Sequence, residues 1–100
     1  MNRQAINNGT WFDHDSATRY EEGSRWDGSN TISLATGSQW DHEWLHQTAG
    51  GAWILESYSA RDYVVDRYDR VSASDAASWL NLNEHSIPKS LMGYGTLTEV

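Results

Sequence analysis

The sequence predicts an α+β domain, in which a three- to four-stranded antiparallel meander carries a C-terminal helix on one face. Two apolar runs flank a Gly-Gly pair within residues 45–58, a pattern typical of a β-hairpin. Apolar residues at helical spacing predict a helix over residues 73–83. The chain has 100 residues, and we expect one domain over residues 1–100.

The first forty residues carry weaker patterns. Residues 1–10 are expected to be irregular, and residues 11–12 can open a strand. A polar residue at the start of residues 15–22 can cap a short helix, which Gly23 would end. Residues 25–34, with a polar turn at their centre, suggest a second and looser hairpin.

The central hairpin is the clearest pattern in the chain. We expect Gly50-Gly51 to form a two-residue turn, because a tight hairpin needs positive φ angles at both central positions. That turn would pair His46 with Leu55. Trp53, Leu55 and Ser57 would then share one face of the sheet.

The C-terminal half continues the sheet and adds the helix. Residues 63–68 are rich in β-forming side chains and are expected to be a third antiparallel strand. Ser72, followed three residues later by Asp75, is a variant of the capping box that begins a helix. We expect that helix over residues 73–83 and an irregular segment over residues 91–100.

The composition excludes several classes of function. Asp and Glu number 14 against 7 for Lys and Arg, which gives a net charge of −7 with neutral histidine. A surface of that sign disfavours direct binding to nucleic acid or to an anionic membrane. The chain has no cysteine, which excludes disulfides, thiolate zinc sites and cysteine nucleophiles. With no apolar run of membrane-spanning length and no visible signal peptide, we expect a cytoplasmic protein.

Tryptophan supplies much of the apolar volume. We expect most of the six rings to pack in a shared core, one from each element, because packing is the commoner fate of large apolar side chains. One or two could instead lie outside as binding anchors, a role in which Trp is enriched. The six are Trp11, Trp26, Trp40, Trp44, Trp53 and Trp79.

One motif has the pattern of a catalytic site. The sequence His42-Glu43-Trp44-Leu45-His46 matches the H-E-x-x-H signature of zinc hydrolases. On a helix, His42 and His46 would bind zinc together while Glu43 activates the metal-bound water. A small zinc-dependent hydrolase is therefore one alternative for the function.

The context of this motif weighs against a zinc site. The motif runs into the predicted hairpin, and two strand residues four positions apart lie about 13 Å apart, too far to hold one ion. No third ligand is evident: Glu56 or Asp62 could serve only if the fold brought them near. His14 and His85 have no partners at metal-ligand spacing. We therefore expect no enzyme, no metal and no cofactor.

Negative charge gathers in residues 13–43, which hold seven acidic residues against two arginines. One interpretation is a solvated surface that keeps a small protein in solution. The other is a docking surface for a basic groove on another protein, where acidic groups steer the encounter and aromatic rings anchor it. If that groove holds nucleic acid, the surface would mimic nucleic acid. The candidate partner-binding residues are Trp11, Asp13, Asp15, Glu21, Glu22, Trp26, Asp27, Trp40, Asp41 and Glu43.

Two segments carry a resemblance to a known group. Residues 36–40, Thr-Gly-Ser-Gln-Trp, and the hairpin of residues 48–55 resemble a loose group of small bacterial proteins carried on plasmids, phages and integrated elements. The resemblance extends over residues 11–85 and includes a capped helix ending near Trp79-Leu80. At the position of His46 that group more often has Tyr, and it has no catalytic residues to carry over.

The resemblance implies an accessory protein of a mobile element, similar in size, charge and setting to phage-encoded inhibitors such as anti-CRISPRs. The leading hypothesis is therefore a non-enzymatic protein that binds a partner with a basic surface. The alternatives are the zinc-dependent hydrolase and a structural or regulatory subunit.

Overall fold

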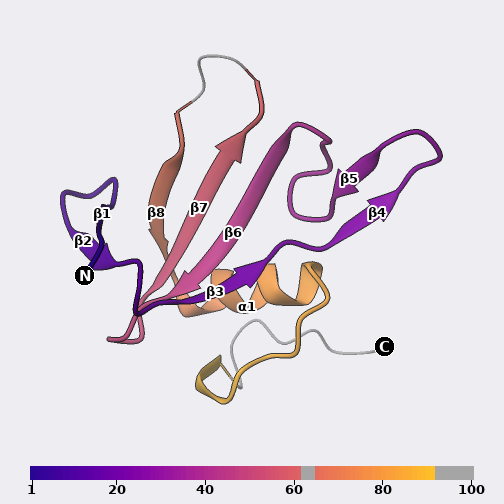
Figure 1. Cartoon of the computed structure of the whole chain (residues 1–100). Helices are drawn as coiled ribbons and strands as arrows, with labels where there is room; N and C mark the ends of the chain where they lie inside the picture. The colour runs from indigo at the N-terminus through magenta and orange to yellow at the C-terminus, as the bar shows by residue number, and fades with distance from the viewer. Residues whose placement is uncertain (62–64, 92–100) are drawn as a thin grey trace.

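The computed structural model describes residues 1–61 and 65–91 and confirms the α+β class (Figure 1). All strand pairs in the described residues are antiparallel: β3-β6-β7-β8 form a four-stranded sheet, and β1-β2 and β4-β5 form two-stranded sheets. The elements are β1 (Arg3–Ala5), β2 (Trp11–Asp13), β3 (Thr18–Glu21), β4 (Ser24–Trp26), β5 (Thr31–Ser33), β6 (Asp41–Gln47), β7 (Trp53–Ser59), β8 (Arg67–Val71), the helix α1 (Ala73–Leu82) and the 3₁₀ turn η1 (Lys89–Leu91).

The four-stranded sheet is only partly the predicted meander. Strands β6, β7 and β8 follow one another in the chain and in the sheet, but the fourth strand is β3, which pairs with the outer edge of β6. The short helix expected over residues 15–22 is therefore wrong. Tyr20 packs into the core, while Arg19 and Glu21 contact Trp44 on the opposite face. Pairing with β6 satisfies backbone groups that β6 would otherwise leave open, and this outweighs a weak local helix pattern.

The hairpin of β6 and β7 closes with three loop residues instead of the predicted two. The Thr48 N–H donates to the Ala52 carbonyl at 2.9 Å, and the Gly51 N–H donates to the Thr48 carbonyl at 2.9 Å. Of the two glycines, only Gly51 has a positive φ, at 90°. A type I turn followed by one left-handed residue is a common three-residue hairpin loop, so Gly50 needs no special backbone angle.

The longer loop shifts the strand register by one residue from the prediction. Leu45, rather than His46, pairs with Leu55, and His46 pairs with Ile54. Paired residues share a face of the sheet, so Leu45 lies on the helix side and His46 on the other. Both side chains are fully buried, which shows that each face of β6 is covered at this level.

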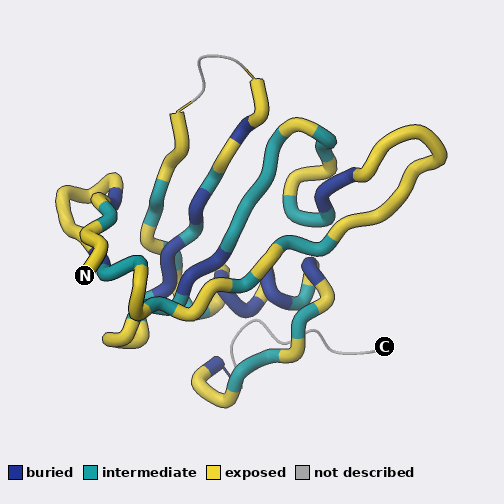
Figure 2. Tube along the Cα trace, viewed as in Figure 1, coloured by how far each residue is buried: buried dark blue, intermediate teal, exposed yellow. Residues whose placement is uncertain are grey.

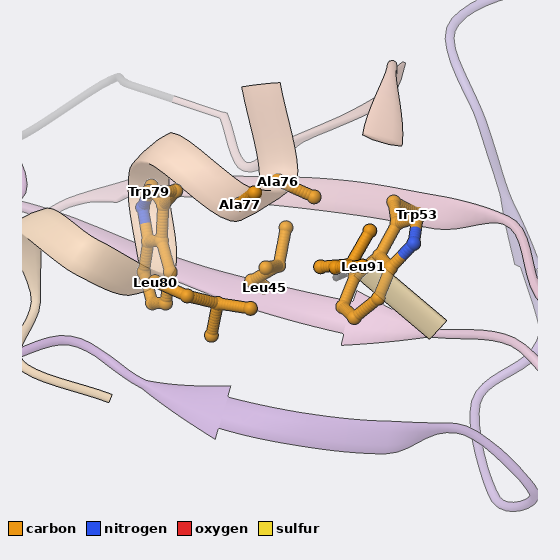
Figure 3. Packing of buried hydrophobic residues seen from close by; sticks show 7 residues of the cluster. All are labelled: Leu45, Trp53, Ala76, Ala77, Trp79, Leu80 and Leu91. Atoms are coloured by element: carbon orange, nitrogen blue, oxygen red, sulfur yellow. The ribbon is translucent and has the colours of Figure 1, made fainter. Parts of the chain in front are cut away.

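The main core lies between the sheet and α1 (Figure 3). The two alanines on the helix let α1 approach the sheet closely, and larger side chains fill the space on either side of them. The predicted apolar stripe of the helix is thus confirmed. Partly buried side chains from β3, β7 and β8 pack around this cluster. The buried members are Leu45, Trp53, Ala76, Ala77, Trp79, Leu80 and Leu91.

Both ends of α1 are capped. The Asp75 N–H donates to the Ser72 hydroxyl at 3.0 Å, as the capping pattern predicts, and the helix ends at Leu82, one residue before its expected end. Beyond it, the buried Asn83 side chain accepts a hydrogen bond from the Gly23 N–H at 2.9 Å. This bond ties the helix end to the segment between β3 and β4. In the described ranges, no helix is long and apolar enough to cross a membrane.

A second, smaller core covers the other face of the sheet. Residues 1–10, which the sequence predicts to be irregular, contain β1, and the Asn7 N–H donates to the Tyr68 carbonyl of β8 at 2.8 Å. The β1–β2 hairpin thereby lies against one end of the sheet (Figure 1). This core consists of Ile6, Phe12 and Ile54, with Ala17 and Tyr68 packed against them.

Three other expectations can be compared with the structure. The looser hairpin is confirmed as β4–β5, with Arg25 paired with Ile32. The third antiparallel strand is confirmed as β8, but it begins at Arg67, and residues 63–64 of the predicted strand lie outside the described residues. Leu91, expected in an irregular tail, is buried in the main core, and residues 92–100 lie outside the described residues.

The expectation that most tryptophans fill the core is wrong. Trp53 and Trp79 are buried, and Trp44 is half-buried. The other three lie largely in solvent, at exposed fractions of 49% for Trp11, 67% for Trp26 and 49% for Trp40. Small residues and aliphatic chains fill the space that these rings were expected to occupy.

The three-residue loop predicts unequal roles for its two glycines. Gly51→Ala places a Cβ in the left-handed region and should lower the free energy of unfolding by about 1–2 kcal/mol. In Gly50→Ala the nearest atom to the new Cβ is the Thr48 Oγ1 at 3.9 Å, so the variant should stay within about 0.5 kcal/mol of wild type. Urea unfolding of both variants measures the difference. Equal losses of unfolding free energy in the two variants would contradict the three-residue turn and the strand register that it sets.

Candidate functional site

The H-E-x-x-H motif does not form a zinc site in this fold. His42 and His46 lie on the strand β6, four residues apart, so about 13 Å of backbone separates their Cα atoms. Glu43 lies on the opposite, helix-side face, where its Oε1 accepts a hydrogen bond from the Trp79 indole N–H at 3.0 Å. The three side chains therefore do not converge, and this motif cannot carry the zinc-hydrolase alternative.

Glu22 holds the start of β6 in place. Its Oε2 lies 2.8 Å from the His42 Nδ1, and its Oε1 accepts a hydrogen bond from the Glu43 N–H at 2.8 Å. The Glu22 side chain is only 13% exposed. Both carboxylate oxygens of Glu22 thus have partners on β6, and we remove Glu22 from the candidate contact residues.

The sheet face beyond the β1–β2 hairpin carries a row of rings. Tyr58 contacts the His42 ring, with ring centroids 5.9 Å apart, and the Trp44 ring, 5.7 Å away. The Arg19 guanidinium lies 4.8 Å from the Trp44 ring centroid, and the Trp44 indole N–H donates to Glu21 Oε2 at 2.9 Å. These contacts order Trp44 as part of the sheet, while Glu21 remains exposed.

Three candidate contact residues, Trp11, Asp13 and Asp15, lie on or beside the β1–β2 hairpin. Asp13 accepts backbone hydrogen bonds from Asn2 at 3.0 Å and Asp15 at 3.1 Å, and the bond from Asn2 contributes most to a lowered pKa of Asp13. The Arg3 guanidinium lies 4.6 Å from the centroid of the Trp11 ring. Asp13 and Trp11 thus already have partners within the hairpin.

Four other candidates lie elsewhere in the fold. Trp26 and Asp27 belong to the β4–β5 hairpin, where Asp27 Oδ1 accepts the Asn30 and Ser29 N–H groups at 2.7 and 2.8 Å. These two bonds lower the pKa of Asp27, the one from Asn30 most. Asp41 begins β6, and Trp40 directly precedes it.

The structure therefore divides the predicted surface into two. Figure 1 shows the β1–β2 and β4–β5 hairpins on opposite sides of the four-stranded sheet. Figure 2 shows the β4–β5 hairpin exposed over most of its length. The candidate residues within 11–43 therefore do not form one continuous patch (Figure 1). Of the two parts, the one over residues 21–43 holds five acidic residues and one arginine.

Sequence reasoning missed one cluster of potential ligands. His14, His46 and Glu56 each offer a ligand atom, and these atoms lie within 4.8 Å of one another. His14 follows β2, His46 lies on β6, and Glu56 on β7. His14 has no second histidine at metal-ligand spacing in the sequence, so no motif indicates it as a ligand. In the observed register His46 pairs with Ile54, and Glu56 lies two residues along β7 on the same face. The predicted register pairs His46 with Leu55 instead, which would place Glu56 on the opposite face.

No family model, no curated protein and no solved structure matches this chain.

Glu43 provides a test of the helix-side contact. Burial raises the pKa of Glu43, the nearby Glu22 charge raises it further, and the Trp79 hydrogen bond opposes both. The folded protein then keeps a proton that the unfolded chain has released, so this carboxyl lowers stability as the pH rises above the unfolded value near 4.5. Glu43→Gln keeps an acceptor for Trp79 and has no proton to lose. We expect the variant to gain stability relative to wild type as the pH rises from about 4 to 7.

Thermal unfolding across that pH range measures the difference between variant and wild type. Glu21→Gln, which removes an exposed carboxylate from the neighbouring strand, is the matched control for the loss of one charge. The burial argument would be wrong if both variants showed the same pH dependence.

Proposed function

We propose that this protein is a non-enzymatic accessory or inhibitor protein of a phage or other mobile element, which binds a partner protein with a basic surface. The observation that carries the proposal is the exposure of Trp26 and Trp40 within residues 21–43, a stretch with a net charge of −4. Its resemblance to small mobile-element proteins supports the setting, and the size and charge are similar in style to those of anti-CRISPRs. The proposal places the protein in the cytoplasm.

The β4–β5 hairpin is suited to contact a partner. All three residues of β4 are exposed, and only Ile32 and Ser33 of β5 are buried. The hairpin holds Trp26 at 67% exposure, and none of the ring contacts among the described residues involves Trp26 or Trp40. A tryptophan that enters a partner pocket can bury on the order of 200 Å², which is enough area for a binding anchor.

The charges around these rings favour a basic partner. Glu21 and Asp27 are exposed and Asp41 is half-buried. Three arginines lie nearby: Arg25 is on the hairpin, Arg19 lies 3.3 Å from Glu21, and Arg61 lies 3.7 Å from Asp41. Such a field speeds the encounter with a positive groove and repels nucleic acid and anionic membranes. A groove that holds nucleic acid fits this chemistry, so the proposed action is competition with nucleic acid for that groove.

We restrict the proposed contact residues to one side of the sheet. The proposed surface keeps Glu21, Trp26, Asp27, Trp40 and Asp41. Glu22 and Glu43 support β6 from within, as described above. The three residues of the β1–β2 side lie on the other side of the sheet and are left out (Figure 1).

A pair of tryptophan variants tests the proposal. The full chain, its Trp26→Ala/Trp40→Ala double variant and Trp11→Ala are each immobilised and exposed to a nuclease-treated lysate of the source organism. Trp11 is the matched control, since it is as exposed as Trp40, at 49%, but lies on the opposite side of the sheet. We expect a basic protein to be retained by wild type and Trp11→Ala and reduced at least about tenfold by the double variant.

Mass spectrometry identifies the retained protein, and release by added salt checks the role of charge. Circular dichroism establishes that all three proteins are folded. Equal retention by the double variant, or no basic protein retained by wild type, would refute this surface as the binding site.

A further inference from the structure

We propose that His14, His46 and Glu56 bind a Zn²⁺ ion that fastens the β1–β2 hairpin to the four-stranded sheet. Two imidazoles and one carboxylate form a donor set that zinc uses in proteins, with a fourth position left for water. The site is independent of the proposed contact surface, with which it shares no residue.

The three ligands come from separate parts of the chain. The His14 backbone N–H donates to the Asn2 carbonyl at 2.8 Å, which fixes His14 at the end of the β1–β2 hairpin. His46 and Glu56 lie on the adjacent strands β6 and β7, with the His46 Nε2 2.8 Å from Glu56 Oε1. The centroids of the two histidine rings are 4.9 Å apart. An ion held by all three would therefore link the hairpin directly to the sheet.

The spacing is close to what zinc requires. The ligand atoms lie within 4.8 Å of one another, whereas bonds of about 2.0–2.1 Å in a tetrahedral site place ligand atoms about 3.3 Å apart. The difference is within the reach of a small side-chain rotation. His14 is only half-buried, so its ring can make that rotation more easily than His46, whose side chain is 1% exposed.

The two nitrogens of the His46 ring differ in their surroundings. Nε2 lies 2.8 Å from Glu56 Oε1, so this nitrogen and this oxygen are the pair that can share an ion. The other nitrogen, Nδ1, is buried with no hydrogen-bond partner in the described structure.

The surroundings support a cation at this point. Tyr68 on β8 pairs with Glu56 on β7, so the two side chains share a face of the sheet. Outer partners of this kind orient metal ligands. Arg19 adds positive charge nearby, but its guanidinium is 3.3 Å from a Glu21 oxygen and rests over Trp44. The rings of Phe12 and Tyr68 flank His46, with centroids 5.5 and 6.3 Å from that of the His46 ring.

Zinc titration of the full chain, stripped of metal with a chelator, tests the site by calorimetry. The test variants are His14→Phe and Glu56→Gln; His42→Phe is the matched control, because His42 stacks on Tyr58 much as His14 stacks on Phe12. We expect one Zn²⁺ per wild-type and His42→Phe chain, and no binding of Mg²⁺. Each test variant should weaken zinc binding more than about 100-fold, beyond the loss caused by a residue that only supports a ligand.

Zinc should also raise the Tm of wild type and His42→Phe but not of the two test variants. Circular dichroism checks folding, and NMR of the histidine rings in the wild type supplies evidence that needs no variant. Added Zn²⁺ should shift the His14 and His46 signals and leave those of His42 and His85 in place. Absence of zinc binding, shifts at His42 or His85 instead, or undiminished binding by His14→Phe would each overturn the proposal.

Discussion

The register of the β6–β7 hairpin is the constraint on which the rest of the structure depends. Side chains alternate between faces, so a slip of one residue would send every side chain of β6 to the opposite face. In the observed register Leu45 meets the helix and His46 meets the N-terminal hairpin. The central strand can therefore serve two cores at once. A turn of three residues, with one left-handed glycine, is what sets this choice.

Local patterns were sufficient for some local elements but not for the β1–β2 hairpin, whose first residues were expected to be irregular. The capped helix and the two hairpins of consecutive strands were predicted from turn residues, caps and apolar spacing. The role of residues 18–21 was not, because these residues become a strand only by pairing with β6, more than twenty positions later in the chain. The turn at Gly50-Gly51 was recognised, but its length was not, since both loop types accept glycine.

The candidate sites also combine features that the sequence indicates with features that only the fold brings together. The sequence shows that residues 13–43 are rich in acidic residues and tryptophan. Whether these residues form one surface depends on the path of β3, which lies between the β1–β2 and β4–β5 hairpins in the chain. The H-E-x-x-H match lies in a strand, as its place beside the hairpin predicts, and this keeps its two histidines apart. Its second histidine instead meets His14 and Glu56, which come from two other segments of the chain. Glu22 looked like a surface charge and is a support for β6.

The second core and the β3–β6 pairing both join segments that are made at different times during synthesis. A chain grows from its N-terminus at about 5–20 residues per second, so Ile6 and Phe12 are made well before Ile54, against which they pack. Strand β3 likewise waits for β6. The N-terminal hairpin and β3 therefore reach their final packing only after β6 and β7 have been made.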